Sequence, residues 1–231
     1  MQYVQNNTPN LPLASFSHDL KTPLACIIGS LDIYNLLKDT LTEENKESLL
    51  YNALNEAKRL NGFITDIMDL ANLQGKIDCE CVDLDIGQLL RQSTQKIKNN
   101  SLRLHEIKID ISAGVIAQVN ELWIQRALEI LLENAIFCTE DSNKTEISLN
   151  SENDSCRIII RDYGKSLTKK SKAVPFQDSE AKSEEIIIGK NRLGLPICKI
   201  IAEMHCGNIS IDRPAIGKGN VFTLTLPLQH C

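Results

Sequence analysis

The stretch Ser17-His18-Asp19-Leu20-Lys21-Thr22-Pro23-Leu24 sets the fold and the chemistry expected of this chain. It places a histidine beside a carboxylate within an apolar pattern of helical spacing, formed by Leu13, Phe16, Leu20, Leu24, Ile27, Leu31 and Tyr34. His18 does not belong to this apolar stripe, so the predicted helix presents it to solvent and to a reaction partner. Pro23 removes a backbone hydrogen-bond donor and predicts a kink just after the histidine. Taken alone, the pattern also fits a surface histidine on an ordinary helix.

A second stripe with the same period follows, formed by Leu50, Ala53, Ala57, Leu60, Ile64, Ile67 and Ala71. The two predicted helices are joined near Lys38–Thr42, where Thr42 and Asn45 offer an N-cap region. A two-helix hairpin buries little apolar surface by itself, so we expect two copies to pair into a four-helix bundle. The prediction is a homodimer formed through the hairpin. A dimerisation hairpin without any chemistry would show the same stripes.

Beyond a break at Gln74-Gly75-Lys76, short strand patterns alternate with helical ones. Strands are expected at 81–84, 107–111, 117–119, 145–149, 157–161, 208–211 and 221–227, and helices at 86–98, 121–138 and 194–205. This order predicts an α+β fold, in which the helical hairpin precedes an α/β sandwich with helices against one face of a mixed sheet. The polar segment from Lys165 to Arg192 has the length of a functional lid or of a segment without fixed structure.

Composition and charge exclude several classes of function. The 231 residues carry 25 Lys and Arg against 30 Asp and Glu, without a basic block, so nucleic acid is not an expected partner. The apolar runs are too short for a membrane span and the first residues lack a signal-peptide pattern, so we expect a cytoplasmic segment without membrane contact. Most of the eight cysteines lie in apolar helix or strand patterns, as reduced thiols do, and Cys79-x-Cys81 lacks a companion pair for zinc.

Two helices carrying S-H-D-L-K-T-P-L before such a sandwich resemble the catalytic core of two-component sensor histidine kinases, from about Leu13 to Leu228. Three segments are most similar in amino-acid sequence to Kdp-type potassium sensor kinases. They are L-L-E-N-A at 131–135, D-R-P at 212–214 and T-L-P at 225–227. The resemblance implies a tail at 1–12, a dimerisation and histidine phosphotransfer domain at 13–75, and an ATP-binding catalytic domain of the histidine-kinase ATPase type at 79–229.

Carried onto this chain, the resemblance implies that His18 is the phosphoacceptor, whose neutral ring nitrogen attacks the γ-phosphate of ATP. Asp19 would hold the other ring N–H and stabilise the imidazolium as it forms. Thr22 matches the position that orients a water for dephosphorylation of the response regulator. All three residues fall within one helical turn. The implied partner is a response-regulator receiver domain, whose aspartate receives the phosphoryl group.

The resemblance also implies a site for ATP and Mg²⁺. Asn134 matches the asparagine that helps to hold Mg²⁺, an ion that prefers hard oxygen ligands. Asp162 matches the acid that accepts the adenine amino group, and Gly164 the glycine that admits the ring. Gly194 and Leu195 match the second glycine-rich turn. The looser matches are Gly217-Lys218-Gly219, similar to the last glycine block but also to a plain hairpin turn, and Phe176, similar to the aromatic residue of the lid.

Five positions depart from the family pattern, namely Ile130, Phe137, Cys138, Ser166 and Arg192. Ile130 and Phe137 lack the polar group and the charge that would meet a triphosphate. Loss of one such contact costs about 1.5–3 kcal/mol, or roughly tenfold to a hundredfold in affinity. Arg192, with Lys182 or Lys190, is positioned in the sequence to restore part of that charge.

The sequence therefore leaves two functions open. The first is a protein histidine kinase that autophosphorylates His18 from Mg-ATP and passes the phosphoryl group to a response regulator. The second is a degenerate kinase that serves as a phosphoacceptor, a phosphatase or a heterodimerising scaffold, with weak or no ATP binding. The intact turn with His18, Asp19 and Thr22 and the pair Asn134 and Asp162 support the first function, which is the one we expect. The five departures motivate the second as the alternative. An ATPase or chaperone with the same sandwich would not explain the histidine helix.

Overall fold

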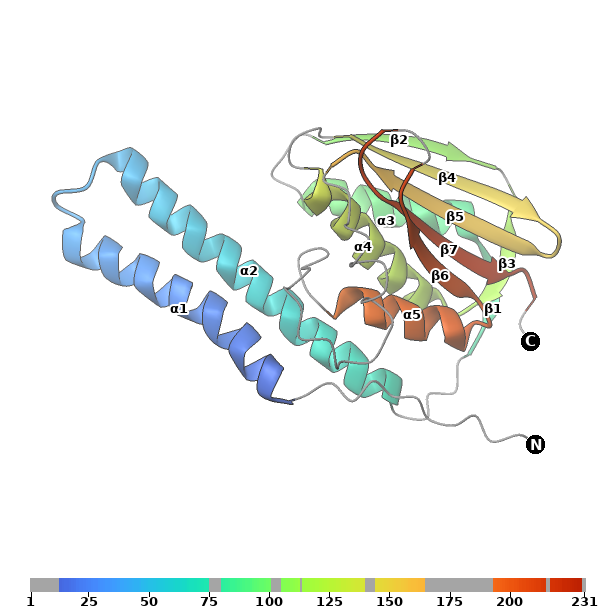
Figure 1. Cartoon of the computed structure of the whole chain (residues 1–231), viewed down its shortest axis with the longest axis horizontal. Coiled ribbons are helices and arrows are strands. Elements are labelled where there is room, and N and C mark those ends of the chain that lie inside the picture. Colours follow the sequence, from blue (N-terminus) through green and yellow to red (C-terminus); the bar gives the residue numbers. More distant parts are fainter. Residues whose placement is uncertain are drawn as a thin grey trace. The chain divides into compact units, whose positions relative to one another are not determined.

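The computed structural model describes residues 13–74, 80–100, 105–112, 114–139, 144–164, 193–214 and 217–229, apart from the side chains of residues 13–18, 74, 100, 137 and 138. The chain divides into two compact units, one holding the N-terminal helices up to Gln74 and the other holding the remaining helices and strands (Figure 1). None of the helices in the described ranges combines the length and the apolar character needed to cross a membrane.

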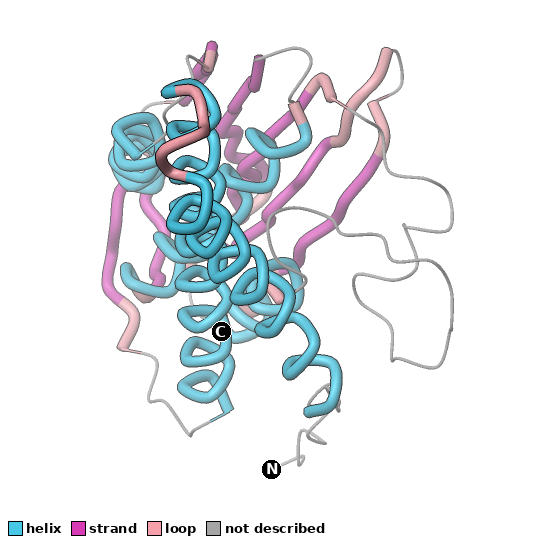
Figure 2. Tube along the Cα trace, turned by 90° about the vertical axis from the view of Figure 1, so that its left-hand side faces the viewer, coloured by secondary structure: helices cyan, strands magenta, loops and turns pink. Residues whose placement is uncertain are grey.

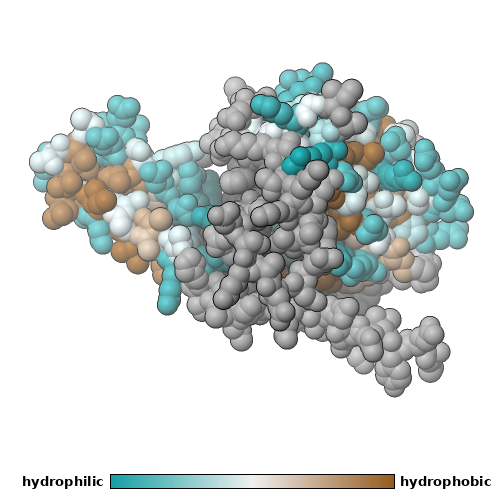
Figure 3. All heavy atoms as spheres, in the orientation of Figure 1, coloured by the Kyte–Doolittle hydropathy of each residue, from teal (hydrophilic) through white to brown (hydrophobic). Residues whose placement is uncertain are grey.

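The first unit is a hairpin of two long helices, α1 (Leu13–Leu37) and α2 (Glu43–Gln74), which pack against each other. Both helices keep large apolar side chains exposed: Leu24, Ile28, Leu31, Ile33, Leu36 and Leu37 on α1, and Leu50, Tyr51, Leu54, Ile64 and Met68 on α2. Figure 3 shows apolar surface gathered over the hairpin. The predicted two-helix hairpin is confirmed, and each helix leaves apolar surface without cover from the other.

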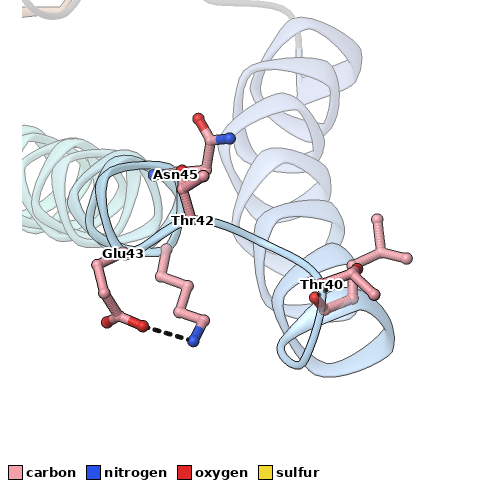
Figure 4. Close-up of polar contacts among 6 residues, drawn as sticks. Thr40, Thr42, Glu43 and Asn45 are labelled. Carbon is pink, nitrogen blue, oxygen red and sulfur yellow. Dashed lines mark hydrogen bonds and ion pairs between the residues drawn. The ribbon is translucent and has the colours of Figure 1, made fainter.

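The turn between the two helices is fixed by local hydrogen bonds (Figure 4). Thr42 Oγ1 accepts a hydrogen bond from the backbone N–H of Asn45 at 3.3 Å, which makes Thr42 the N-cap of α2 as predicted. Lys46 Nζ lies 2.7 Å from Glu43 Oε1 across the first turn of the helix. Thr40 Oγ1 donates to the backbone oxygen three residues earlier at 3.0 Å. Short polar side chains therefore end one helix and begin the next.

The second unit is an α/β sandwich, and its fold agrees with the predicted class. Its elements are β1 (Val82–Asp85), α3 (Ile86–Asn100), β2 (Glu106–Ile111), β3 (Ile116–Val119), α4 (Glu121–Cys138), β4 (Lys144–Glu152), β5 (Ser155–Asp162), α5 (Gly194–Met204), β6 (Asn208–Asp212) and β7 (Val221–Pro227). Five strands form a mixed sheet in the order β2-β4-β5-β7-β6, in which only β2 and β4 are parallel, while β1 and β3 form a separate antiparallel pair. The helices cover one face of this sheet, and Figure 2 shows the strands as a continuous layer.

Alternation along the strands builds the core of the sandwich. Ile147, Ile160 and Phe222 form one buried row across β4, β5 and β7, because they are register partners with the same side-chain direction. Helix α4 contacts β4 and β5 and contributes fully buried leucines to the same layer. Asp162 lies two residues after Ile160, on the same face of β5, so this strand also places a carboxylate in the interior.

The β4–β5 hairpin is longer than the sequence predicted. The two strands pair as far as Glu152 and Ser155, and the connecting residues Asn153 and Asp154 have φ angles of 47° and 61°. A two-residue loop with positive φ at both positions matches the twist of antiparallel strands, and Asn and Asp tolerate that conformation. Backbone pairing therefore extends through polar residues whose side chains gave no strand pattern.

The cysteines follow the predicted reduced state in part. Cys156 and Cys198 are buried reduced cysteines within β5 and α5, and Cys26 is an exposed reduced cysteine on α1. Burial raises the pKa of Cys156 to about 11. Cys206, which follows α5, is disulfide-bonded, so the expectation of a free thiol is wrong at this position.

Candidate functional site

Asp162, at the end of β5, is a fully buried carboxylate whose two oxygens are both hydrogen-bonded. Oδ1 accepts from the backbone N–H of Gly164 at 3.0 Å, and Oδ2 accepts from Nδ2 of Asn220 at 2.9 Å. The backbone N–H of Asp162 donates to the carbonyl oxygen of Asn220 at 3.0 Å. Burial raises the pKa of Asp162, while the hydrogen bonds from Asn220 and Gly164 lower it. The structure thus brings Asp162 and Gly164 together, as two residues of one predicted site.

Gly219 brings Asn220 beside this carboxylate. Gly219 lies in the connection between the antiparallel strands β6 and β7, and its φ angle is 103°. A Cβ atom added there would lie 2.0 Å from the carbonyl oxygen of Asp162. Only glycine allows this approach and this conformation. Gly217-Lys218-Gly219 therefore belongs to a hairpin connection, and Gly219 also packs directly against the backbone of the candidate site.

Sequence reasoning missed Asn220. The sequence shows Asn220 only as a polar residue between a Gly-x-Gly segment and an apolar strand. That pattern by itself fits an ordinary turn. The contact with Asp162 depends on the pairing of β5 with β7, which are far apart in the sequence.

Tyr163 anchors the 162–164 turn on the opposite face of the sheet. Its hydroxyl donates to the carboxylate of Glu146, and Lys144 Nζ lies 2.7 Å from the other oxygen of that carboxylate. Lys144 Nζ and the guanidinium carbon of Arg161 each lie 4.6 Å from the centre of the Tyr163 ring, within cation–π distance. The hydrogen bonds from Lys144 and Tyr163 lower the pKa of Glu146. The turn is therefore held from both faces of the sheet.

Asn134 and Gly194 meet where α4 lies beside the start of α5. Asn134 is 3% exposed, and its Nδ2 atom has no hydrogen-bond partner within the described part of the chain. A Cβ atom at Gly194 would lie 3.9 Å from this Nδ2 atom and 2.8 Å from Cγ2 of Ile130. A buried amide without a partner is costly in a folded protein, so this group is suited to a ligand. Ile130, by contrast, is buried and packs against Gly194.

Gly194 and Leu195 form the first turn of α5. Leu193 stands at the N-cap position, and a leucine side chain cannot accept the hydrogen bonds that a polar cap would accept. The first intrahelical bond of this turn is the one from Ile197 N–H to the carbonyl oxygen of Leu193. Among the described residues, no side chain at the N-cap position therefore caps this helix start, and helix N-termini favour anions.

His18, Asp19 and Thr22 lie within one turn of α1. Asp19 is half-buried and Thr22 is exposed, while Pro23 is buried within the same helix. The side chain of His18 is not among the parts of the chain that the structure describes, so its exposure to solvent stays a prediction. The other predicted features outside the described residues are Cys79, Ser166, Phe176, Lys182, Lys190, Arg192 and the side chains of Phe137 and Cys138.

Comparison with known proteins matches both units. Residues 13–76 match the His Kinase A (phospho-acceptor) domain, and residues 119–230 match the histidine kinase-, DNA gyrase B- and HSP90-like ATPase family. Sensor histidine kinase RppB of Synechocystis is 26% identical over 93% of this chain and 48% of its own length. Sensor protein KdpD of Clostridium acetobutylicum is 26% identical over 94% of this chain and 24% of its own length. The chain thus spans about half or less of these relatives.

Solved structures show the same fold at low sequence identity. The histidine kinase AdeS of Acinetobacter baumannii superposes with a TM-score of 0.67 at 18% identity, over 91% of this chain and 98% of its own. The histidine kinase ThkA, in complex with the response regulator TrrA, has a TM-score of 0.71 at 18% identity, over 93% of this chain and 60% of its own. ShkA, in complex with AMPPNP, has a TM-score of 0.63 at 22% identity, over 95% of this chain and 46% of its own. With a phosphoacceptor-domain hairpin followed by a kinase-type ATPase sandwich, this chain is a two-component histidine kinase catalytic core.

Proposed function

We propose that this chain binds Mg-ATP in its α/β unit, autophosphorylates His18, and transfers the phosphoryl group to the aspartate of a response-regulator receiver domain. The observation that carries the proposal is the buried Asp162 carboxylate, held by Gly164 and Asn220 in a unit of the ATPase family. A buried carboxylate fixed by neutral donors keeps lone pairs for a further donor, such as the adenine amino group. Because ATP is a cytosolic metabolite, we place the reaction in the cytoplasm.

The phosphate groups are assigned to the start of α5. The N–H groups of Gly194 and Leu195 and the positive end of the helix dipole favour an anion there. The Nδ2 atom of Asn134, which has no hydrogen-bond partner among the described residues, lies beside Gly194, and the same side chain carries an acceptor oxygen. We assign the acceptor oxygen to Mg²⁺ and the amino group to a phosphate oxygen.

The residues present fit Mg²⁺ only if the nucleotide supplies most of its ligands. No cluster of three or more His, Cys, Asp or Glu side chains suited to a metal ion occurs among the described residues. Mg²⁺ is often bound by one or two protein oxygens together with phosphate oxygens and water, so a single ligand from Asn134 is consistent with it. When bound, the ion would neutralise the phosphate charge that develops during transfer.

In the proposed reaction, a bond forms between a neutral ring nitrogen of His18 and the γ-phosphorus, while the bond from that phosphorus to the bridging oxygen breaks and releases ADP. Asp19 stabilises the positive charge that develops on the ring and accepts the proton from the other ring nitrogen. Thr22, exposed on the same turn, orients a water for dephosphorylation of the regulator. In this proposal the hairpin provides the phosphoryl acceptor, His18, and the sandwich binds the phosphoryl donor, ATP.

The functional unit we propose is a homodimer formed through the hairpin. The exposed apolar side chains of α1 and α2 need a partner surface, and a second copy supplies an identical one.

The packing of Ile130 favours a second candidate function. Because this side chain is buried against Gly194, it adds no polar contact at the phosphate end of the site. A degenerate kinase would keep His18 and Thr22 for phosphoacceptor or phosphatase work, or act as a heterodimerising scaffold, and would bind ATP weakly or not at all.

Calorimetric titration of Mg-ATP into the purified protein separates the two candidates. We expect micromolar binding by the wild type and none by Asp162→Ala, because the variant lacks the adenine acceptor. Asp110→Ala, which removes an exposed carboxylate from β2 of the same sheet, is the matched control and should bind like the wild type. No binding by the wild type would favour the degenerate kinase, and binding unaffected by Asp162→Ala would place the nucleotide elsewhere.

A further inference from the structure

The Asn220 side chain holds the candidate adenine acceptor in one orientation. Asn220 and Asp162 are both fully buried, and they share two hydrogen bonds, Asn220 Nδ2 to Asp162 Oδ2 at 2.9 Å and Asp162 N–H to Asn220 O at 3.0 Å. The close approach of Gly219 to the Asp162 carbonyl fixes the backbone that carries the amide. The Nδ2 donor is therefore carried by a short, fully buried side chain on a closely packed stretch of backbone.

The two fixed donors define what the carboxylate can still recognise. A carboxylate has about four lone-pair sites, and the donors from Gly164 and Asn220 occupy one on each oxygen. The remaining sites accept hydrogen bonds and cannot donate one while the group is ionised. A purine with an amino group at position 6 supplies the matching donor, whereas a purine with an oxo group there presents a second acceptor and is repelled.

We propose that Asn220 is a positioning residue that sets the base selectivity of this site, by holding Asp162 as an acceptor for the exocyclic amine of a 6-aminopurine. The inference rests on the proposed nucleotide site and names what makes that site selective. Without the amide, Oδ2 loses a donor and the buried carboxyl group takes up a proton more readily. A protonated carboxyl group can donate to an oxo group, so discrimination between the two purines falls.

The test is calorimetric titration of Mg-ATP and Mg-ITP, which differ at position 6 of the purine, into the whole chain and two variants. Asn220→Leu has nearly the same size and no donor, while Asn220→Thr keeps a hydroxyl donor. We expect the wild type to prefer ATP by at least tenfold, and Asn220→Leu to lower this preference roughly tenfold to a hundredfold. Asn220→Thr should restore part of the preference.

The ratio of the two affinities separates positioning from a purely structural role. A variant that only loosens the fold weakens both nucleotides alike and leaves the ratio unchanged, which would overturn the inference. If Asn220→Leu does not fold, Asn220→Thr carries the test, because its weaker donor should still lower the ratio measurably. A wild type that prefers ATP, with variants that keep the same ratio, refutes the role of Asn220 alone. A wild type that binds neither nucleotide refutes the proposed function, and the inference with it.

Discussion

At the scale of single residues, the candidate site depends on one close approach between two stretches of backbone. Gly219 lies against the carbonyl group of Asp162, and this contact places Asn220 beside the carboxylate. Tyr163, between its two cations and Glu146, holds the same turn from the other face of the sheet. The position of the Asp162 carboxylate is therefore sensitive to small changes in the residues that surround it.

A pair of glycine substitutions tests this dependence. Gly219→Ala should destabilise the protein by on the order of 1–3 kcal/mol and weaken ATP binding, because its φ is 103° and the new Cβ would lie 2.0 Å from Asp162 O. Gly29→Ala in α1 is the control, since a Cβ there meets nothing within 4 Å and should stabilise the helix by about 0.5–1 kcal/mol. Thermal unfolding and ATP titration measure both effects. Equal behaviour of the two variants would argue against the close contact.

At the scale of elements, Asn120 ties together three parts of the α/β unit. Its side-chain oxygen accepts from the N–H of Trp123 and caps α4, and its Nδ2 donates to the carbonyl oxygen of Glu80, both at 3.1 Å. Its backbone N–H donates to Nε2 of the buried His205 at 3.0 Å, while Nδ1 of the same ring lies 2.7 Å from the carbonyl oxygen of Ile201. The ring must therefore carry its proton on Nδ1. These hydrogen bonds of Asn120 fix the start of α4, the helix that carries Asn134.

Two N-cap substitutions should act on separate units. Asn120→Ala should lower the stability of the α/β unit by about 1–2 kcal/mol, because it removes the cap of α4 and the bond to Glu80. Thr42→Ala, which removes the cap of α2, should cost about 1 kcal/mol in the hairpin. Amide hydrogen exchange resolves the two units. Loss of protection spread evenly over both units in either variant would contradict the assignment.

The elements were easier to predict from the sequence than the site. Helix α4 begins and ends where predicted, because a polar cap at Asn120 precedes a long apolar run. The burial of Asp162 follows from its place in the alternation along β5, but its role came from family resemblance alone. The Asn220 contact and the packing of Ile130 against Gly194 depend on which strands and helices become neighbours. Local sequence patterns carry no record of such long-range contacts.

At the scale of the whole molecule, the exposed apolar side chains of the hairpin predict association. Ile28→Asp should weaken the proposed dimer at least tenfold, because the substitution introduces a charge at a side chain that is 50% exposed on α1 and buried in the proposed bundle. Leu122→Asp on α4, at a side chain that is 77% exposed in the other unit, is the control and should leave the dimer intact. Sedimentation of both variants and the wild type measures the effect. A monomeric wild type, or a dimer lost only in the control, would refute the hairpin interface.

The most direct test of the proposed kinase activity is transfer of label from γ-labelled Mg-ATP to the protein. We expect an acid-labile phosphoryl group on the wild type, absent from His18→Gln and from Asp162→Ala, which the protein passes on to a receiver domain. Asp110→Ala should be labelled like the wild type. A wild type that binds ATP and stays unlabelled, or label that persists in His18→Gln, would rule out autophosphorylation at His18.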